Sequence, residues 1–145
     1  MNSRKPLLRA TACALLSILG ICNAGGLPGD DDAELQSLRQ SYRNKQWKFI
    51  GERAGDCHMT GVLTIFENGR AVWAASSMTE STSFADIWHE SIQVFDSEGR
   101  LLFGFGVWDS PGMQDDGSHY FWKNYGEFPK GLFDLASKAS SLGEC

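Results

Sequence analysis

One tight turn between two apolar segments constrains this chain more than any other feature of its sequence. Residues 57–66 and 71–78 are rich in apolar side chains, and Glu67-Asn68-Gly69-Arg70 separates them. Asn-Gly accepts the positive φ angles that a short hairpin turn requires, so the two segments are predicted to pair as antiparallel strands. We therefore expect the core to be built on an antiparallel sheet.

Turn-forming residues separate further predicted strands in the same way. The segment from Gln46 reads as a strand before this hairpin, and residues 85–95 and 100–108 form a second predicted hairpin through 96–99. Residues 109–118 contain Pro, Gly and paired Asp and are predicted to be a loop. Residues 119–125 then offer one more aromatic strand.

Helical spacing appears at both ends of the chain beyond residue 24. Leu35, Leu38 and Tyr42 lie on one stripe and predict a helix over about residues 31–44. A second stripe predicts a C-terminal helix that starts near Pro129 and is closed by Gly143, with Leu132, Leu135, Ala136, Ala139 and Leu142 on its apolar side. The expected fold is α+β, a sandwich-like antiparallel meander of about six strands with a helix at each end.

The N-terminal residues have the three-part layout of a secretory signal. Arg4, Lys5 and Arg9 precede an apolar run that is far shorter than the roughly 20 residues needed to span a bilayer. Small residues before a cut after Ala24 predict a signal peptide over 1–24 and a single exported domain over 25–145, located in the periplasm. Cleavage before Cys22, which would make that cysteine a lipid anchor, is the alternative.

Two cysteines, Cys57 and Cys145, remain after the signal. In an oxidising compartment such a pair favours a disulfide, which would attach the C-terminus to the start of a strand. A reactive thiol is the alternative, but no Cys-x-x-Cys motif is present to lower its pKa.

Charge and motifs exclude several classes of function. Residues 25–145 carry ten basic and eighteen acidic residues, a net charge of −8, which disfavours nucleic acid as a partner. The motif search finds no nucleophile elbow, phosphate-binding glycine loop or zinc-protease motif, so we expect no enzyme. His58, His89 and His119 define no ligand spacing, and no metal site is predicted. Carboxylates of the 109–118 loop leave calcium open at a partner interface, although their spacing matches no EF-hand loop and favours a solvated turn.

The excess negative charge lies in one stretch. Residues 79–127 hold nine acidic and two basic residues. If the loops 78–84 and 109–118 share one end of the sheet, they make an acidic surface that could steer a basic partner, whereas the alternative is that acidic surface only aids solubility. The loop 79–84, TESTSF, carries small hydroxyl residues around one carboxylate and suits entry into a narrow cleft; an ordinary soluble turn is its alternative.

Taken as a whole, the chain resembles the small periplasmic immunity proteins that bacteria with a type VI secretion system pair with a muramidase effector. The resemblance is carried by the leader MNSRKPLLRATACALLSILGICNAG, the total length, the TESTSF loop and the acidic, aromatic-rich strands. It implies a protein that binds a secreted peptidoglycan glycosidase, one to one, and blocks its substrate groove.

Charge and loop position then select the candidate contact residues. The loop would fill the groove of the enzyme, and acidic and aromatic residues elsewhere would form the rim. The loop residues are Thr79, Glu80, Ser81, Thr82 and Ser83, and the rim residues are Asp115, Asp116, Tyr125 and Glu127. A carbohydrate-binding module of the cell envelope, with exposed tryptophans stacking on sugar rings, is the alternative function.

Overall fold

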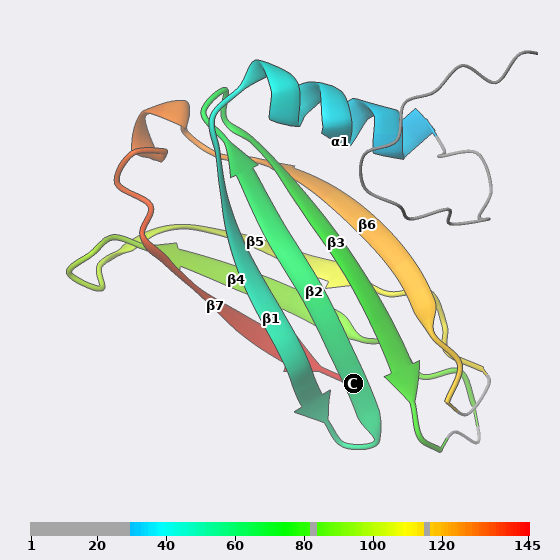
Figure 1. Cartoon of the computed structure of the whole chain (residues 1–145). Coiled ribbons are helices and arrows are strands. Elements are labelled where there is room, and N and C mark those ends of the chain that lie inside the picture. The colour runs from blue at the N-terminus through cyan, green and yellow to red at the C-terminus, as the bar shows by residue number, and fades with distance from the viewer. Residues whose placement is uncertain (1–29, 82–83, 115–116) are drawn as a thin grey trace, which may run out of the picture.

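The computed structural model describes residues 30–81, 84–114 and 117–145, and these form one helix and two antiparallel sheets (Figure 1). The signal peptide and its cleavage site lie outside the described residues. The helix α1 (Asp30–Ser41) comes first. Seven strands follow, with a 3₁₀ turn at 130–132 before the last: β1 (Asn44–Ala54), β2 (Cys57–Phe66), β3 (Arg70–Thr79), β4 (His89–Phe95), β5 (Leu101–Asp109), β6 (Tyr120–Glu127) and β7 (Lys138–Glu144).

The strands divide into a four-stranded sheet, in the order β1-β2-β3-β6, and a three-stranded sheet, in the order β5-β4-β7. The β2–β3 hairpin turns as predicted, because Gly69 adopts φ +91° and its N–H donates to the carbonyl of Phe66 at 2.9 Å. The chain leaves the first sheet after β3, builds β4 and β5 in the second, and returns as β6 beside β3. The antiparallel, sandwich-like arrangement with an N-terminal helix is thus confirmed.

An aromatic cluster fills the space between the two sheets. Trp73 of β3 is fully buried at its centre, and its ring lies 5.8 Å from Phe49, 6.4 Å from Trp108 and 6.2 Å from Trp122, measured between centroids. The small residue Gly61 of β2 makes room for it, since a Cβ there would lie 2.3 Å from the Trp73 ring. Large aromatic surface removed from water supplies most of the stabilisation in such a core.

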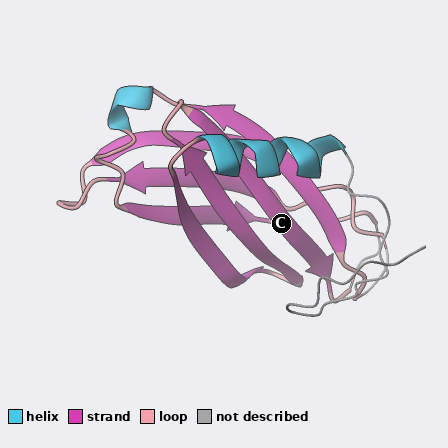
Figure 2. Cartoon of the chain, turned by 45° about the horizontal axis from the view of Figure 1, so that its top comes forward, coloured by secondary structure: helices cyan, strands magenta, loops and turns pink. Residues whose placement is uncertain are grey.

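The helix α1 covers one end of the outer face of the four-stranded sheet (Figures 1 and 2). Leu35 and Leu38 pack on Phe66 and Val72, which point away from the sandwich core. Glu34 of the helix pairs with Arg70 of β3 across its polar side. Among the residues that the structure describes, no helix covers the rest of this outer face, toward the far ends of β2 and β3.

The predicted C-terminal helix is wrong, and the expected six strands are seven. After the 3₁₀ turn, β7 pairs with the free edge of β4, from His89 opposite Glu144 to Phe95 opposite Lys138. The apolar residues that fitted a helical stripe follow strand alternation instead: Ala139 packs on the core, while Leu142 is 55% exposed. The backbone groups on the edge of β4 need partners, and pairing with them outweighs local helical preference in a short segment.

Gly143 allows β7 to pack closely against the buried Trp88 ring, because a Cβ at this position would lie 2.1 Å from Cζ2 of that ring. Gly143→Ala is expected to lower the free energy of unfolding by about 1 to 3 kcal/mol, as overpacked cores do. Gly131→Ala is the matched control, since no atom lies within 4 Å of a Cβ built there. Urea unfolding measures both, and equal midpoints for the two variants would contradict this packing.

One ionisable side chain, Glu90 of β4, is completely buried between the sheets. The indole N–H of Trp88 donates to its Oε2 at 2.9 Å, and the hydroxyl of Ser141 donates to its Oε1 at 2.8 Å. Burial raises the pKa of the Glu90 carboxyl above its ordinary value, and these two hydrogen bonds only partly oppose that shift. A carboxyl with a raised pKa in the folded state destabilises the fold once it ionises.

The stability of the protein should therefore depend on pH through Glu90. Protonated Glu90 contributes its full stabilisation below the pKa of glutamate in the unfolded chain. This stabilisation is lost as the pH rises through the raised pKa of Glu90 in the folded protein. The Glu90→Gln side chain stays neutral at every pH. As the pH increases above the ordinary glutamate range, the free energy of unfolding of the wild type should therefore fall relative to that of Glu90→Gln. Urea unfolding over a pH series, with the exposed Glu98→Gln as control, measures this difference; two curves that stay parallel would argue against a buried, neutral Glu90.

Candidate binding surface

Three connections meet at one end of the sandwich, which we call the loop end: the β1–β2 turn (55–56), the β3–β4 connection (80–88) and the β5–β6 connection (110–119). The N–H of Glu80 donates to the carbonyl of Asp56 at 2.8 Å, and the N–H of Gly117 donates to that of Thr79 at 2.7 Å. Asp86 and Met113 exchange two backbone hydrogen bonds. The two loops that the sequence analysis singled out therefore do lie side by side.

Thr79, the first residue of the TESTSF loop, is completely buried. Its hydroxyl lies 2.8 Å from Oδ2 of Asp86 and 3.1 Å from the carbonyl oxygen of Ser81. These hydrogen bonds connect the start of the loop to a point further along it. Thr79 thus holds the loop in shape from inside and presents no surface of its own to a partner.

Glu80 is half exposed and already paired within the chain. Its Oε2 lies 3.0 Å from a guanidinium nitrogen of Arg53, and its Oε1 lies 2.7 Å from Nε2 of His58. Both partners come from the β1–β2 hairpin. The carboxylate therefore ties the β3–β4 connection to the neighbouring hairpin, and much of its charge is neutralised before any partner arrives.

The exposed part of the loop is apolar at its end. Ser81 is exposed, and Phe84 is 88% exposed, the largest value among the large hydrophobic side chains of the described residues. The loop residues Thr82 and Ser83 and the rim residues Asp115 and Asp116 lie outside the described residues. The sequence prediction named the polar members of the loop and not Phe84, because an aromatic side chain by itself favours burial over exposure.

The structure does not bring the two remaining predicted rim residues to the loop end. Tyr125 and Glu127 belong to the second half of β6, where they pair with Val72 and Arg70 near α1. The loop end lies at the other end of the same strand, where Tyr120 pairs with Ser77. Glu127 and the TESTSF loop therefore lie about the length of β6 apart and do not belong to the same rim.

Acidic side chains are also more dispersed than the sequence suggested. Glu90 is buried in the core, and Asp96 accepts a 2.7 Å hydrogen bond from Arg100 in the β4–β5 turn, away from the loop end. The hydrogen bonds from Arg100 hold the pKa of Asp96 below its usual range, although burial of the carboxylate partly opposes this shift. Of the described carboxylates at the loop end, Glu80 pairs with Arg53 and His58, whereas Asp56 and Asp86 have no basic partner among the ion pairs of the described residues.

A groove runs along β2, β3 and β6 on the outer face of the four-stranded sheet and reaches the loop end; we call it the outer groove. Two adjoining hollows of about 510 and 360 Å³ share Thr60, Ser76 and Phe121. Phe121 is 80% exposed and stands beside them, because Tyr120 and Trp122 alternate with it and face the core. The groove is further lined by His58, Ala74, Met78, His119, Lys123 and Tyr125. His58, which pairs with Glu80, connects this groove to the loop end.

Ser76 and His119 form the one pair in the groove with the composition of a nucleophilic site, with the hydroxyl 3.1 Å from Nδ1. A working site also needs a group that orients the histidine and donors for an oxyanion. Ser76 lies between Thr60 and Phe121 in the paired strands, so the backbone around it is engaged in the sheet. Within the described ranges no carboxylate hydrogen-bonds to His119.

Fold and surface together define a small, disulfide-linked β-sandwich domain with an aromatic outer groove and one end built of interlocked loops. Residues 62–145 match the model of a family of unknown function, DUF6294, and the chain belongs to this family. No curated protein and no solved structure matches the chain. Over the residues that the structure covers, none of the helices has the length and apolar character needed to traverse a bilayer.

Proposed function

We propose that this protein is a periplasmic immunity protein that binds a type VI secreted muramidase and blocks its substrate groove. The proposal begins from the sequence resemblance, which spans the leader, the length and the TESTSF loop. It makes the loop end the contact surface, with the cell's own peptidoglycan protected by steric occlusion.

The observation that carries the proposal is an exposed aromatic side chain on a fixed base. Phe84 belongs to a connection whose described residues are held by the partly buried Thr79–Asp86 hydrogen bond and by the Glu80 pairs with Arg53 and His58. Residues that are already held in the free protein lose little conformational entropy on binding, so more of their contact energy appears as affinity. Buried aromatic anchors dominate the energy of many interfaces.

The charge of the exported domain supports the same partner. An enzyme that works on anionic wall polymer tends to carry a positive groove, and a domain with net charge −8 is attracted to it over distances of about 10 Å. A glycosidase general acid stays protonated and can donate a hydrogen bond. Ser81, an exposed residue next to Glu80, is a described residue of the loop whose hydroxyl could receive it.

Binding without turnover is the other part of the proposal. The proposal treats the Ser76–His119 pair as part of a binding surface, because among the described residues no carboxylate hydrogen-bonds to the pair. The carbohydrate-binding alternative needs exposed tryptophans. All five tryptophans are buried or partly buried, so this structure offers it no stacking platform of that kind.

Co-expression with the candidate muramidase tests the proposal. The expected result is a complex of one copy of each protein that survives size-exclusion chromatography, and loss of peptidoglycan digestion by the enzyme when the complex forms. The purified domain alone should neither digest peptidoglycan nor change its tryptophan fluorescence on adding soluble wall fragments. An enzyme that digests peptidoglycan at the same rate with an excess of this protein present would refute the proposal.

A further inference from the structure

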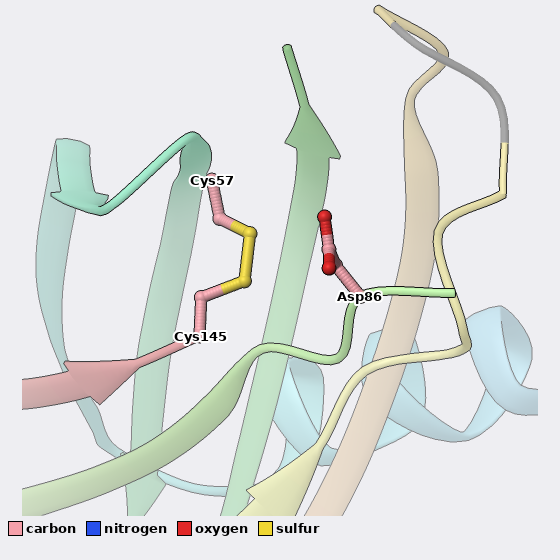
Figure 3. A group of neighbouring side chains, drawn as sticks. All are labelled: Cys57, Asp86 and Cys145. Carbon is pink, nitrogen blue, oxygen red and sulfur yellow. A yellow bond between two sulfur atoms is a disulfide. The ribbon is translucent and has the colours of Figure 1, made fainter. Parts of the chain in front are cut away.

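A cluster of three possible metal ligands lies beneath the loop end (Figure 3). Cys57 begins β2, Cys145 follows β7, and their side chains are joined in a disulfide that closes 88 positions of the sequence. Asp86 of the β3–β4 connection points its carboxylate toward this bond. The sulfur atoms and a carboxylate oxygen all lie within 4.8 Å of one another.

The three side chains are held together by more than the disulfide. Cys145 directly follows Glu144, which is paired with His89 of β4, and Cys57 is paired with Thr79 of β3. Asp86 is fixed by two backbone hydrogen bonds to Met113. These backbone contacts do not involve the sulfur atoms, so they do not depend on the sulfur–sulfur bond.

We infer that the reduced protein binds zinc through Cys57, Cys145 and Asp86. Tetrahedral zinc, with bonds of about 2.3 Å to sulfur and about 2.0 to 2.2 Å to oxygen, separates its ligand atoms by about 3.5 to 3.8 Å. Two freed sulfurs and the carboxylate reach this spacing with side-chain adjustments alone. Two thiolates and a carboxylate suit zinc, a borderline-soft cation, better than calcium.

The hydrogen bond from Thr79 gives the site an orienting partner. The buried Thr79 hydroxyl lies 2.8 Å from Oδ2 of Asp86, and its geometry leaves Oδ1 available as the ligand atom. Such second contacts fix the direction of a ligating carboxylate and strengthen metal binding. Cys57 is 2% exposed, whereas Cys145 is exposed, so the ion enters, and its fourth ligand binds, from the Cys145 side.

The chemistry needs an external reductant, and a phosphine supplies it. The phosphine gives two electrons to the sulfur–sulfur bond and leaves as its oxide with oxygen from water, while each sulfur takes one proton. Zinc then displaces both protons as it forms two zinc–sulfur bonds. The oxidised protein has no thiolate to offer, so the disulfide and the zinc site exclude each other.

Anaerobic titration of the phosphine-reduced protein with Co²⁺, followed by Zn²⁺, tests this inference. One equivalent of Co²⁺ should produce a thiolate-to-cobalt charge-transfer band, which Zn²⁺ should abolish, and the oxidised protein should show neither. Asp86→Asn should weaken zinc binding at least tenfold, and the exposed Glu98→Gln should not. Asp86→Cys, which replaces the carboxylate with a third thiol, should restore it.

Circular dichroism of each reduced variant, recorded with and without zinc, keeps the test decisive if the disulfide is important for folding. A chain that unfolds on reduction should refold with one equivalent of Zn²⁺. The inference is overturned by a cobalt complex without the thiolate band, by equal zinc affinities of the wild type and Asp86→Asn, by failure of Asp86→Cys to restore binding, or by a reduced chain that stays unfolded with zinc.

Discussion

Replacing Cys57 and Cys145 together by alanine is expected to lower the free energy of unfolding by about 4 kcal/mol. The disulfide joins residues 88 positions apart, and a loop of this size restricts the unfolded chain strongly in the chain-entropy account of disulfide stabilisation. Natural domains of this size are stable by about 5 to 15 kcal/mol, so the variant should fold but should unfold at a much lower urea concentration. Urea unfolding of the oxidised wild type and the double variant measures the difference.

Reduction provides the matched control for this prediction. A phosphine should lower the urea midpoint of the wild type toward that of the double variant and should leave the double variant unchanged, provided that metal is removed with a chelator. An unchanged wild-type midpoint on complete reduction would contradict the prediction. It would mean that strand pairing of β2 and β7 stabilises this end of the fold without the disulfide.

Phe84→Ala is expected to weaken binding to the muramidase that we propose as the partner by about 2 to 4 kcal/mol, or about 30-fold to 1,000-fold in the dissociation constant. The ring is 88% exposed in the free protein, so the fold gains little from it and the partner can bury it almost completely. Most of the change should appear as faster dissociation, because the variant keeps the charge that steers association. Surface plasmon resonance with the immobilised enzyme measures both rates.

Leu101→Ala is the control for Phe84→Ala. Leu101 is also a large exposed hydrophobic residue, at 59%, but it begins β5 beside the β4–β5 turn, away from the loop end. Its dissociation constant should match that of the wild type, and both variants should keep the free energy of unfolding of the wild type within about 0.5 kcal/mol, as measured by urea unfolding. If Phe84→Ala binds as tightly as the wild type, the TESTSF loop is not the anchor of the interface.

The strands were more predictable than the helices because their signals are local. Asn68-Gly69 specifies its hairpin turn through backbone angles that few other residues adopt, and β2 begins and ends where the sequence indicated. The segment 130–145 shows the opposite case. Its apolar spacing suits a helix in isolation, but β4 has an edge that only a further strand can satisfy, and the sequence of the segment itself contains no information about that edge.

The candidate surface divides in the same way. The position of the TESTSF loop between two strands and the pairing of Cys57 with Cys145 followed from sequence. The engagement of Glu80 by Arg53 and His58, the burial of Thr79 and the distance of Glu127 from the loop did not. Those facts depend on which strands are neighbours, and strand order is a property of the assembled sheets.

The sequence by itself determined the antiparallel character of the sheets, the N-terminal helix and the disulfide. Turn geometry and helical spacing are local properties of the chain, and the two cysteines that follow the predicted signal peptide leave a single possible pair. Only the tertiary structure decided that the C-terminal segment is a strand, that Phe84 and Phe121 face solvent, and that Asp86 lies beside the disulfide. Each of these depends on contacts between residues far apart in the chain, where the free energy of packing and of satisfying backbone hydrogen bonds exceeds local preference.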